Sequence, residues 1–197
     1  MSLLVPPHEP PPCVSRRAVL RSAAALAGFL ALPVTARAQQ PLASPAFWDL
    51  PRTLWLRRAA TGEEIRETYF SDGRLQTRGY DRVCVLLRDV RTGQAVQMHA
   101  VLLDILRGMQ GWLEGYGYPR PIIVNSGYRS RGTNAMTEGA ALGSMHLRGR
   151  AADIRVPGVP TDYLARLGLY LSGGGVGFYP AKGFVHVDSG RLRAWRG

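Results

Sequence analysis

The segment Ser144–Asp153 constrains the fold of this chain more than any other, because it places an imidazole and a carboxylate seven positions apart, beside a glycine. A second imidazole, His186, follows Asp153 by 33 residues, in the alternating run Gly183–Asp188. Catalytic zinc sites usually take three protein ligands and leave the fourth position to water. His146, Asp153 and His186 therefore predict a hydrolytic zinc site, and the chain has to fold so that the two segments meet.

Strand periodicity favours this convergence. Because side chains alternate along a strand, His186 and Asp188 share one face while Val187 between them faces the core. If Asp153 lies on the adjacent strand and His146 on the loop before it, the three predicted ligands point at one ion.

The spacing within the first segment argues against coincidence. In the alternative interpretation, His146 is an ordinary loop histidine and Asp153 is a partner for Arg155. The five fixed residues of the pattern Ser-x-His-x-x-Gly-x-Ala-x-Asp would occur by chance roughly once in a million starts. Gly149 would allow the loop to turn tightly, and Ser144 would hold it by a hydrogen bond to the backbone.

The first 38 residues have the features of an export signal. Ser15–Leu20 contains an arginine pair, Ala23–Val34 is apolar, and Ala36–Ala38 is a small-residue cleavage site. A membrane anchor is the alternative, but the apolar run is shorter than the roughly 20 residues that a spanning helix needs. We therefore expect twin-arginine export to the periplasm, cleavage after Ala38, and no stable membrane insertion of the mature chain.

The mature chain is predicted to consist of a linker or arm at residues 39–52 and a single domain at residues 53–197. The whole chain has a net charge of +11, and loss of four arginines and Glu9 with the leader would leave +8. Nearly all of this charge is arginine, which suits binding of carboxylate or phosphate. An exported protein meets anionic wall polymers, so we expect no nucleic-acid partner.

Two other reactive side chains are predicted to be structural. Cys84 is the only cysteine of the mature chain, so no intramolecular disulfide is possible. It stands among apolar residues and is expected to be buried, rather than to act as a catalytic thiol. His99 is expected to be a partly exposed helix histidine rather than a metal ligand.

Hydrophobic periodicity predicts a mixture of strands and helices. The predicted strands are 54–56, 64–70, 121–124, 150–156, a strand within 173–179, and 184–188. The predicted helices are 80–89, 96–114, 133–142 and 161–171. Ser71–Gly73 is typical of a hairpin turn.

Three motifs carry a resemblance to a known family. They are Ser144-x-His-x-x-Gly-x-Ala-x-Asp153, Ser126-Gly-Tyr-Arg-Ser130 and Val185-His-Val-Asp188. These motifs resemble those of the zinc peptidases that include D-Ala-D-Ala carboxypeptidases, lysostaphin-type enzymes and the hedgehog fold. Further segments, such as Leu87–Gly93 and Gly174–Pro180, resemble the periplasmic murein endopeptidase K group, and the similarity extends over nearly all of residues 52–197.

The resemblance implies an α+β fold with a small antiparallel sheet flanked by helices. It also implies one zinc ion per chain, held by His146, Asp153 and His186, and the peptide cross-links of peptidoglycan as substrate. Zinc lowers the pKa of its bound water to about 7 and polarises the scissile carbonyl. Because stem peptides of the wall carry free carboxylates, a basic cleft would attract them. We therefore predict a zinc-dependent murein endopeptidase.

The residues expected to contact substrate lie in the same motifs. Arg129 is expected to bind a substrate carboxylate or the developing oxyanion, because its guanidinium suits either task. The alternative is a structural ion pair within its loop. Ser126, Tyr128 and Ser144 are expected to line the substrate site.

The general base is not in the position that many relatives use, two or three residues before the last ligand. Those positions hold Phe184 and Gly183. Asp188 is the nearest candidate, either as the base or as a carboxylate that orients a ligand imidazole. His99 is a more distant candidate.

Two other functions stay open at this point. One is a wall-binding module that keeps the ion and has lost its base, and the other is a carboxypeptidase that releases terminal D-Ala. The sequence also leaves open the oligomeric state and which cross-link is cut, that between D-Ala and diaminopimelate or that between two diaminopimelates.

Overall fold

The computed structural model describes residues 45–197, so the predicted signal peptide and residues 39–44 of the predicted arm lie outside the described residues. The described part of that arm contains the short helix α1 (Pro45–Asp49). Strand β1 (Arg52–Arg58) begins shortly after it.

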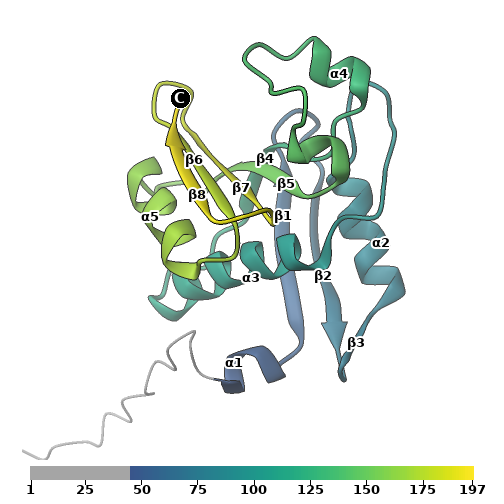
Figure 1. Cartoon of the computed structure of the whole chain (residues 1–197). Coiled ribbons are helices and arrows are strands. Elements are labelled where there is room, and N and C mark those ends of the chain that lie inside the picture. The colour runs from purple at the N-terminus through teal and green to yellow at the C-terminus, as the bar shows by residue number, and fades with distance from the viewer. Residues whose placement is uncertain (1–44) are drawn as a thin grey trace, which may run out of the picture. The chain divides into compact units, whose positions relative to one another are not determined.

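Eight strands form one sheet, in the order β3-β2-β1-β4-β5-β7-β6-β8 (Figure 1). Besides β1, the strands are β2 (Glu64–Ser71), β3 (Arg74–Leu75), β4 (Ile122–Ser126), β5 (Ala151–Arg155), β6 (Gly175–Tyr179), β7 (Phe184–Asp188) and β8 (Arg193–Arg196). β1 runs parallel to β4 and β6 runs parallel to β8, while the other neighbours are antiparallel. The α+β class is confirmed, but the expected small antiparallel sheet is wrong, because the sheet is large and mixed.

The two parallel pairs arise from the way the chain returns to the sheet. Parallel neighbours need a crossover connection, and the chain between β1 and β4 passes through the β2–β3 hairpin and two helices. β8 follows β7 and pairs on the outer side of β6. Sequence reasoning missed β8 because its four residues include two arginines and resemble a charged tail.

Helices α2 (Thr77–Leu86), α3 (Ala100–Gly115) and α5 (Thr161–Leu171) cover one face of the sheet (Figure 1). α2 packs against β2, α3 against β1 and α5, and α5 against β6 and β7. The core between them includes Leu56, Leu102 and Val185, and it also buries Cys84 as predicted. No helix of the described residues is long and apolar enough to cross a membrane.

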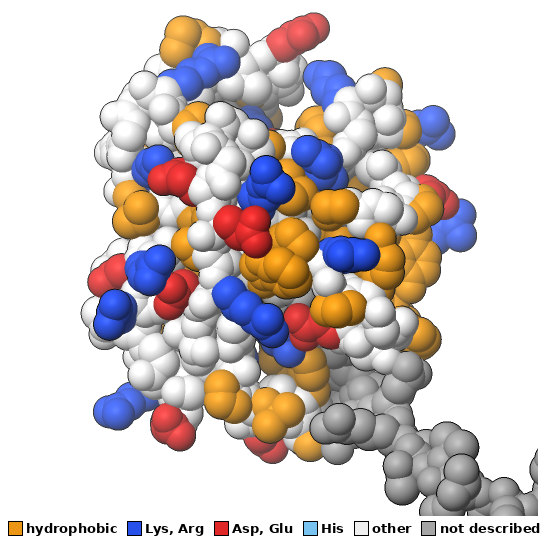
Figure 2. Space-filling model, turned by 180° about the vertical axis from the view of Figure 1, so that it is seen from behind, with side chains coloured by type: hydrophobic (Ala, Val, Ile, Leu, Met, Phe, Trp, Pro, Cys, Tyr) orange, Lys and Arg blue, Asp and Glu red, His pale blue; other side chains and the backbone are white. Residues whose placement is uncertain are grey.

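The opposite face of the sheet is not covered by these three helices. Seen from behind (Figure 2), hydrophobic side chains gather in the middle of the molecule, with Lys and Arg side chains around them. Two short elements, α4 (Arg131–Ala135) and the 3-10 helix η1 (Met145–Arg148), belong to the long connection between β4 and β5.

Tertiary contacts shift the start of the second long helix. α3 begins at Ala100 rather than at residue 96, because the backbone before it bonds to other parts of the chain. The N–H of Met98 donates to Cys84 Sγ at 3.3 Å, and the N–H of His99 donates to the Gly149 carbonyl at 2.9 Å.

The predicted helix at residues 133–142 is wrong over most of its length. α4 ends at Ala135, and the chain then forms turns up to residue 143. Gly139 has a φ of 69°, which a helix does not allow, and the side chain of Asn134 donates to the Ala141 carbonyl at 3.0 Å. This turn structure forms one wall of the cleft described below.

Candidate metal centre

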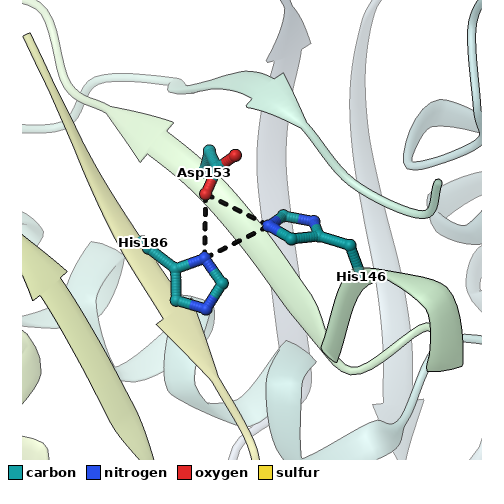
Figure 3. A group of neighbouring side chains, drawn as sticks. All are labelled: His146, Asp153 and His186. Carbon is teal, nitrogen blue, oxygen red and sulfur yellow. Dashed lines mark hydrogen bonds and ion pairs between the residues drawn. The ribbon is translucent and has the colours of Figure 1, made fainter. Parts of the chain in front are cut away.

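The three residues predicted as metal ligands meet on the sheet face that α3 and α5 do not cover (Figure 3). Asp153 on β5 lies directly opposite His186 on β7 in the antiparallel register, and η1 brings His146 from the preceding loop. Asp153 Oδ1 lies 2.9 Å from His186 Nδ1 and 3.2 Å from His146 Nε2. The two imidazole nitrogens are 3.1 Å apart.

Local structure at η1 accounts for the position of His146. Ser144 precedes η1, and its hydroxyl oxygen accepts the N–H of His146 at 3.3 Å. Gly149 ends the turn with a φ of 63°, a left-handed conformation that glycine adopts at little cost. Both backbone roles match those predicted from the sequence.

The outer nitrogen of each imidazole is also held. His146 Nδ1 donates to the Gly127 carbonyl at 2.6 Å, which leaves Nε2 as an acceptor directed at the cluster. His186 Nε2 lies 3.0 Å from Asp188 Oδ2, which favours a proton on Nε2 and an acceptor at Nδ1. Three acceptor atoms therefore converge, an arrangement that is unfavourable unless a cation or protons lie between them. Outer hydrogen bonds of this kind are typical of metal-bound histidine.

Burial and charge favour the protonation states that a metal requires at His146 and Asp153, and a protonated ring at His186. The ligand residues are 2% (His146), 5% (Asp153) and 7% (His186) exposed. Burial lowers the pKa of His146 in spite of the nearby carboxylate. Burial opposes ionisation of Asp153, but the charges and hydrogen bonds of the two histidines outweigh it and lower the pKa of this carboxyl group. Burial also opposes a charge on His186, but hydrogen bonds to Asp153 and Asp188 outweigh it and raise the pKa of the ring.

These donors fit a divalent ion. One neutral imidazole and one carboxylate are in the ligand form already, and a cation would displace the proton that His186 gains from its two carboxylate neighbours. Among the described residues, His146, Asp153 and His186 are the only group whose ligand atoms lie close enough together, within 4.8 Å, to hold a metal.

Asp188 lies behind the imidazole of His186 and away from the cluster. Its side chain is fully buried. Besides the bond to His186, Oδ2 accepts from Arg193 Nη2 at 2.6 Å, and Oδ1 accepts from Arg193 Nη1 at 3.0 Å and from the N–H of Gly190 at 2.8 Å. These contacts support the orienting alternative for Asp188 rather than the general-base alternative, because the carboxylate is buried and both of its oxygens already accept hydrogen bonds.

Arg129 lies beside the cluster on the loop after β4. Its Nε donates to Ser126 Oγ at 2.8 Å, and its Nη2 donates to the second carboxylate oxygen of Asp153. Arg129 therefore forms an ion pair, but its partner is Asp153 on β5 rather than a residue of its own loop. Arg129 also lines the cleft, and its Nη1 donates to no described residue, so a nitrogen remains for substrate.

The other predicted contact residues differ in position. Ser144 lines the cleft, whereas Ser126 and Tyr128 do not. Tyr128 packs against the hydrophobic core, and its hydroxyl lies 3.4 Å from Gln94 Oε1. His99 also lies outside the cleft lining, where its Nδ1 is 2.9 Å from Ser189 Oγ.

The cluster lies in a cleft of about 860 Å³. The turns at residues 137–145 form one wall, and side chains of β6, β7 and β8 form the other. The charged lining residues outside the cluster are Arg129, Glu138, Lys182, Arg191 and Arg193. Arg129 and Arg193 are paired with Asp153 and Asp188, which leaves Lys182 and Arg191 against Glu138, and this positive excess favours anionic molecules.

Comparison with known proteins places the chain in a family. The model of the family described as peptidoglycan L,D-endopeptidase MepK matches residues 48–195, which include the whole cluster. The chain belongs to this family. The MepK of Escherichia coli strain K12 is 36% identical over 180 residues, covering 85% of this chain and 94% of that protein. The probable MepK of Haemophilus influenzae is 36% identical over 156 residues, covering 75% of this chain and 80% of that protein. MepK enzymes belong to a larger group of metal-dependent peptidases.

Sequence reasoning missed one residue beside the MepK-type cluster. Trp195 on β8 lines the cleft, and its ring centroid lies 5.2 Å from that of His186. Its Nε1 donates to the hydroxyl of Tyr179 at 2.9 Å, which holds the indole over β6. The alternation of side chains along β8 could have indicated this strand, but the arginines at both of its ends suggested an exposed segment instead.

Gly177 provides the space for Trp195, and this gives a first prediction. A Cβ at position 177 would lie 2.6 Å from ring carbons of Trp195. We expect Gly177→Ala to destabilise the fold by about 1–3 kcal/mol, because overpacking forces side chains off their preferred conformations. Denaturant unfolding of both proteins measures this. The matched control is Gly132→Ala in α4, where a Cβ meets nothing within 4 Å and helix propensity favours alanine. Equal stability of Gly177→Ala and wild type would contradict the prediction.

Proposed function

We propose that this chain is a zinc-dependent peptidoglycan endopeptidase that hydrolyses peptide cross-links of the bacterial wall. The observation that carries the proposal is the convergence of His146, Asp153 and His186 in a basic cleft, in a chain that belongs to the MepK family. One zinc ion per chain is the proposed cofactor, since two imidazoles and one carboxylate are typical ligands of catalytic zinc.

The residues of the cleft have separate proposed tasks. When bound, zinc supplies a Lewis acid and an activated water. His146, Asp153 and His186 hold it, while the Gly127 carbonyl and Asp188 keep the imidazoles in the required tautomers. Arg129 Nη1 is placed to donate to the oxygen that becomes negative as the amide is attacked.

A proton acceptor is also needed, and Asp188 is saturated. Besides Asp153, the cleft lining contains one carboxylate, that of Glu138 on the opposite wall. It is exposed and forms no ion pair with a described residue. We propose Glu138 as the residue that takes the proton from the attacking water, since an ionised, solvated carboxylate is suited to this task.

The names of the relatives indicate which cross-link is cut, and the N-terminal sequence indicates where the chain works. They describe L,D-endopeptidases of peptidoglycan. Of the two cross-links considered, the bond between two diaminopimelates joins an L-centre to a D-centre, so we propose that bond as the target. We further propose that the chain works in the periplasm after twin-arginine export, because its N-terminus contains the paired arginines and the cleavage site of such a signal. Peptidoglycan stem peptides are the proposed partner, without nucleic acid.

Digestion of purified sacculi by the mature chain, with and without a chelator, tests the function. We expect zinc-dependent conversion of cross-linked muropeptide dimers to monomers, read by chromatography and mass spectrometry. Unchanged dimers from a folded, zinc-loaded protein would contradict the proposal and favour a binding module. Release of free D-Ala without loss of dimers would identify a carboxypeptidase instead.

A further inference from the structure

A row of side chains extends from the cleft across neighbouring strands, on the face of the sheet that α2, α3 and α5 do not cover. Phe184 on β7 belongs to the cleft wall, and the antiparallel register of β5 and β7 places Arg155 beside it. Arg155 pairs with Ile123 on β4, and Ile123 pairs with Arg57 on β1. We call Arg155, Ile123 and Arg57 the arginine row. It is continuous with the cleft, because Phe184, which lines the cleft, is the neighbour of Arg155 on β7.

The two guanidinium groups of the row form no ion pair within residues 45–197. Both arginines are exposed, and neither forms a salt bridge with a described residue. The acid opposite Arg57 is Glu64, and its Oε1 accepts the indole N–H of Trp55 at 2.6 Å. Elsewhere on the surface, five arginines pair with acids, namely Arg52, Arg82, Arg88, Arg107 and Arg166. The row therefore presents unpaired positive charge beside the cleft.

Ile123 gives the row an apolar centre. It is 5% exposed, yet it is not part of the main hydrophobic core. Its neighbours across the sheet are the two arginines, whose aliphatic stems cover apolar surface while their charged ends reach solvent. On this side of the molecule, Figure 2 shows hydrophobic side chains in the middle, with Lys and Arg side chains and some Asp and Glu side chains around them. Two exposed arginines spaced across neighbouring strands suit an extended chain with spaced carboxylates.

We propose that the arginine row is a second binding site for the cross-linked substrate, in which Arg155 and Arg57 bind carboxylates of the stem peptide that extends out of the cleft. The inference rests on the proposed function. Arg155 is two residues along β5 from Asp153, about 7 Å at the usual strand rise, and Arg57 lies two strand spacings further, about 10 Å. An extended peptide covers about 3.3 Å per residue, so a stem of four or five residues spans the row.

The double variant Arg57→Gln/Arg155→Gln tests this with a purified cross-linked muropeptide as substrate. We expect its KM to rise about tenfold, because each solvated charge pair contributes a few-fold to affinity, while kcat stays within about twofold. The KM of the wild type should also rise more steeply with salt than that of the variant. Arg78→Gln is the matched control, since Arg78 is an exposed arginine on α2 without a described ion pair, and its KM should not change.

A second variant separates charge from packing. Arg57→Lys/Arg155→Lys keeps both charges and aliphatic stems, so its KM should stay close to that of the wild type. An unchanged KM in the glutamine variant would overturn the arginine row and leave the proposed function intact. A KM raised equally in the lysine and glutamine variants would also overturn it, because positive charge at these two positions would then not be what binds the substrate.

A binding experiment tests the arginine row even if the proposed function is wrong. If the zinc-loaded wild type cleaves no cross-link, cosedimentation of the full chain with sacculi measures the row by itself. Weaker cosedimentation of the glutamine variant would then support the row as a wall-binding surface. Equal cosedimentation would overturn it, as would a loss of binding to anionic lipid vesicles without any loss of binding to sacculi.

Discussion

His146→Ala is expected to abolish zinc binding and to lower cross-link cleavage by more than about 100-fold, since loss of only an outer partner of a zinc ligand typically costs 10–100-fold. The variant removes one of three convergent ligand atoms and leaves Asp153 and His186 to hold the ion alone. It also frees the Gly127 carbonyl, which accepts the second nitrogen of this ring. Zinc content after dialysis and the rate of dimer loss from sacculi measure the two effects.

His99→Ala is the matched control for this experiment. His99 is exposed, lies outside the cleft lining, and contacts Ser189 rather than the cluster. We expect this variant to keep one zinc per chain and nearly full activity. A His146→Ala protein that retains zinc and cleaves cross-links would exclude this cluster as the metal centre.

Asp188→Asn is expected to lower zinc affinity by about 10–100-fold, the usual cost of losing a carboxylate behind a metal-bound histidine. The amide keeps the size of the side chain but removes the charge that holds His186 Nε2–H and both nitrogens of Arg193. If Asp188 only orients His186, activity should recover substantially at saturating zinc. Competition with a chromophoric chelator gives the affinity, and assays over a range of zinc concentrations give the recovery.

The general-base alternative for Asp188 makes the opposite prediction. Zinc affinity would stay unchanged while activity is lost at every zinc concentration. Arg193→Gln provides a second comparison, because it removes the partner of Asp188 without touching His186. We expect a smaller loss of zinc affinity than in Asp188→Asn, in the same direction.

The metal cluster illustrates what local pattern can predict. The spacing of His146 and Asp153, and the alternation around His186, predicted two ligands on adjacent strands and a third on the loop before one of them, and the structure brings these side chains together. The same patterns predicted the roles of Ser144 and Gly149 in the loop, because capping and left-handed turns depend on neighbouring residues alone.

The role of Asp188 illustrates what the patterns left open. Because side chains alternate along a strand, Asp188 lies on the same face as His186. That position fits a general base and an orienting carboxylate equally well. The decisive contacts come from Arg193 and Gly190, which lie beyond the last predicted strand, 184–188. Trp195 was missed because it lies on β8, a strand that was not predicted. β8 becomes part of the cleft wall only by pairing with β6.

The sequence by itself therefore determined the loop that presents His146, because this loop follows from spacing along one short segment. Its resemblance to the zinc peptidases gave the α+β class, and the ligand set stays a prediction. Only the tertiary structure decided that the sheet is mixed and eight-stranded, that α3 starts at Ala100, and that Asp188 lies behind His186. These features depend on which strands become neighbours. That choice is made by packing and hydrogen bonding between segments distant in the chain, and local periodicity does not record it.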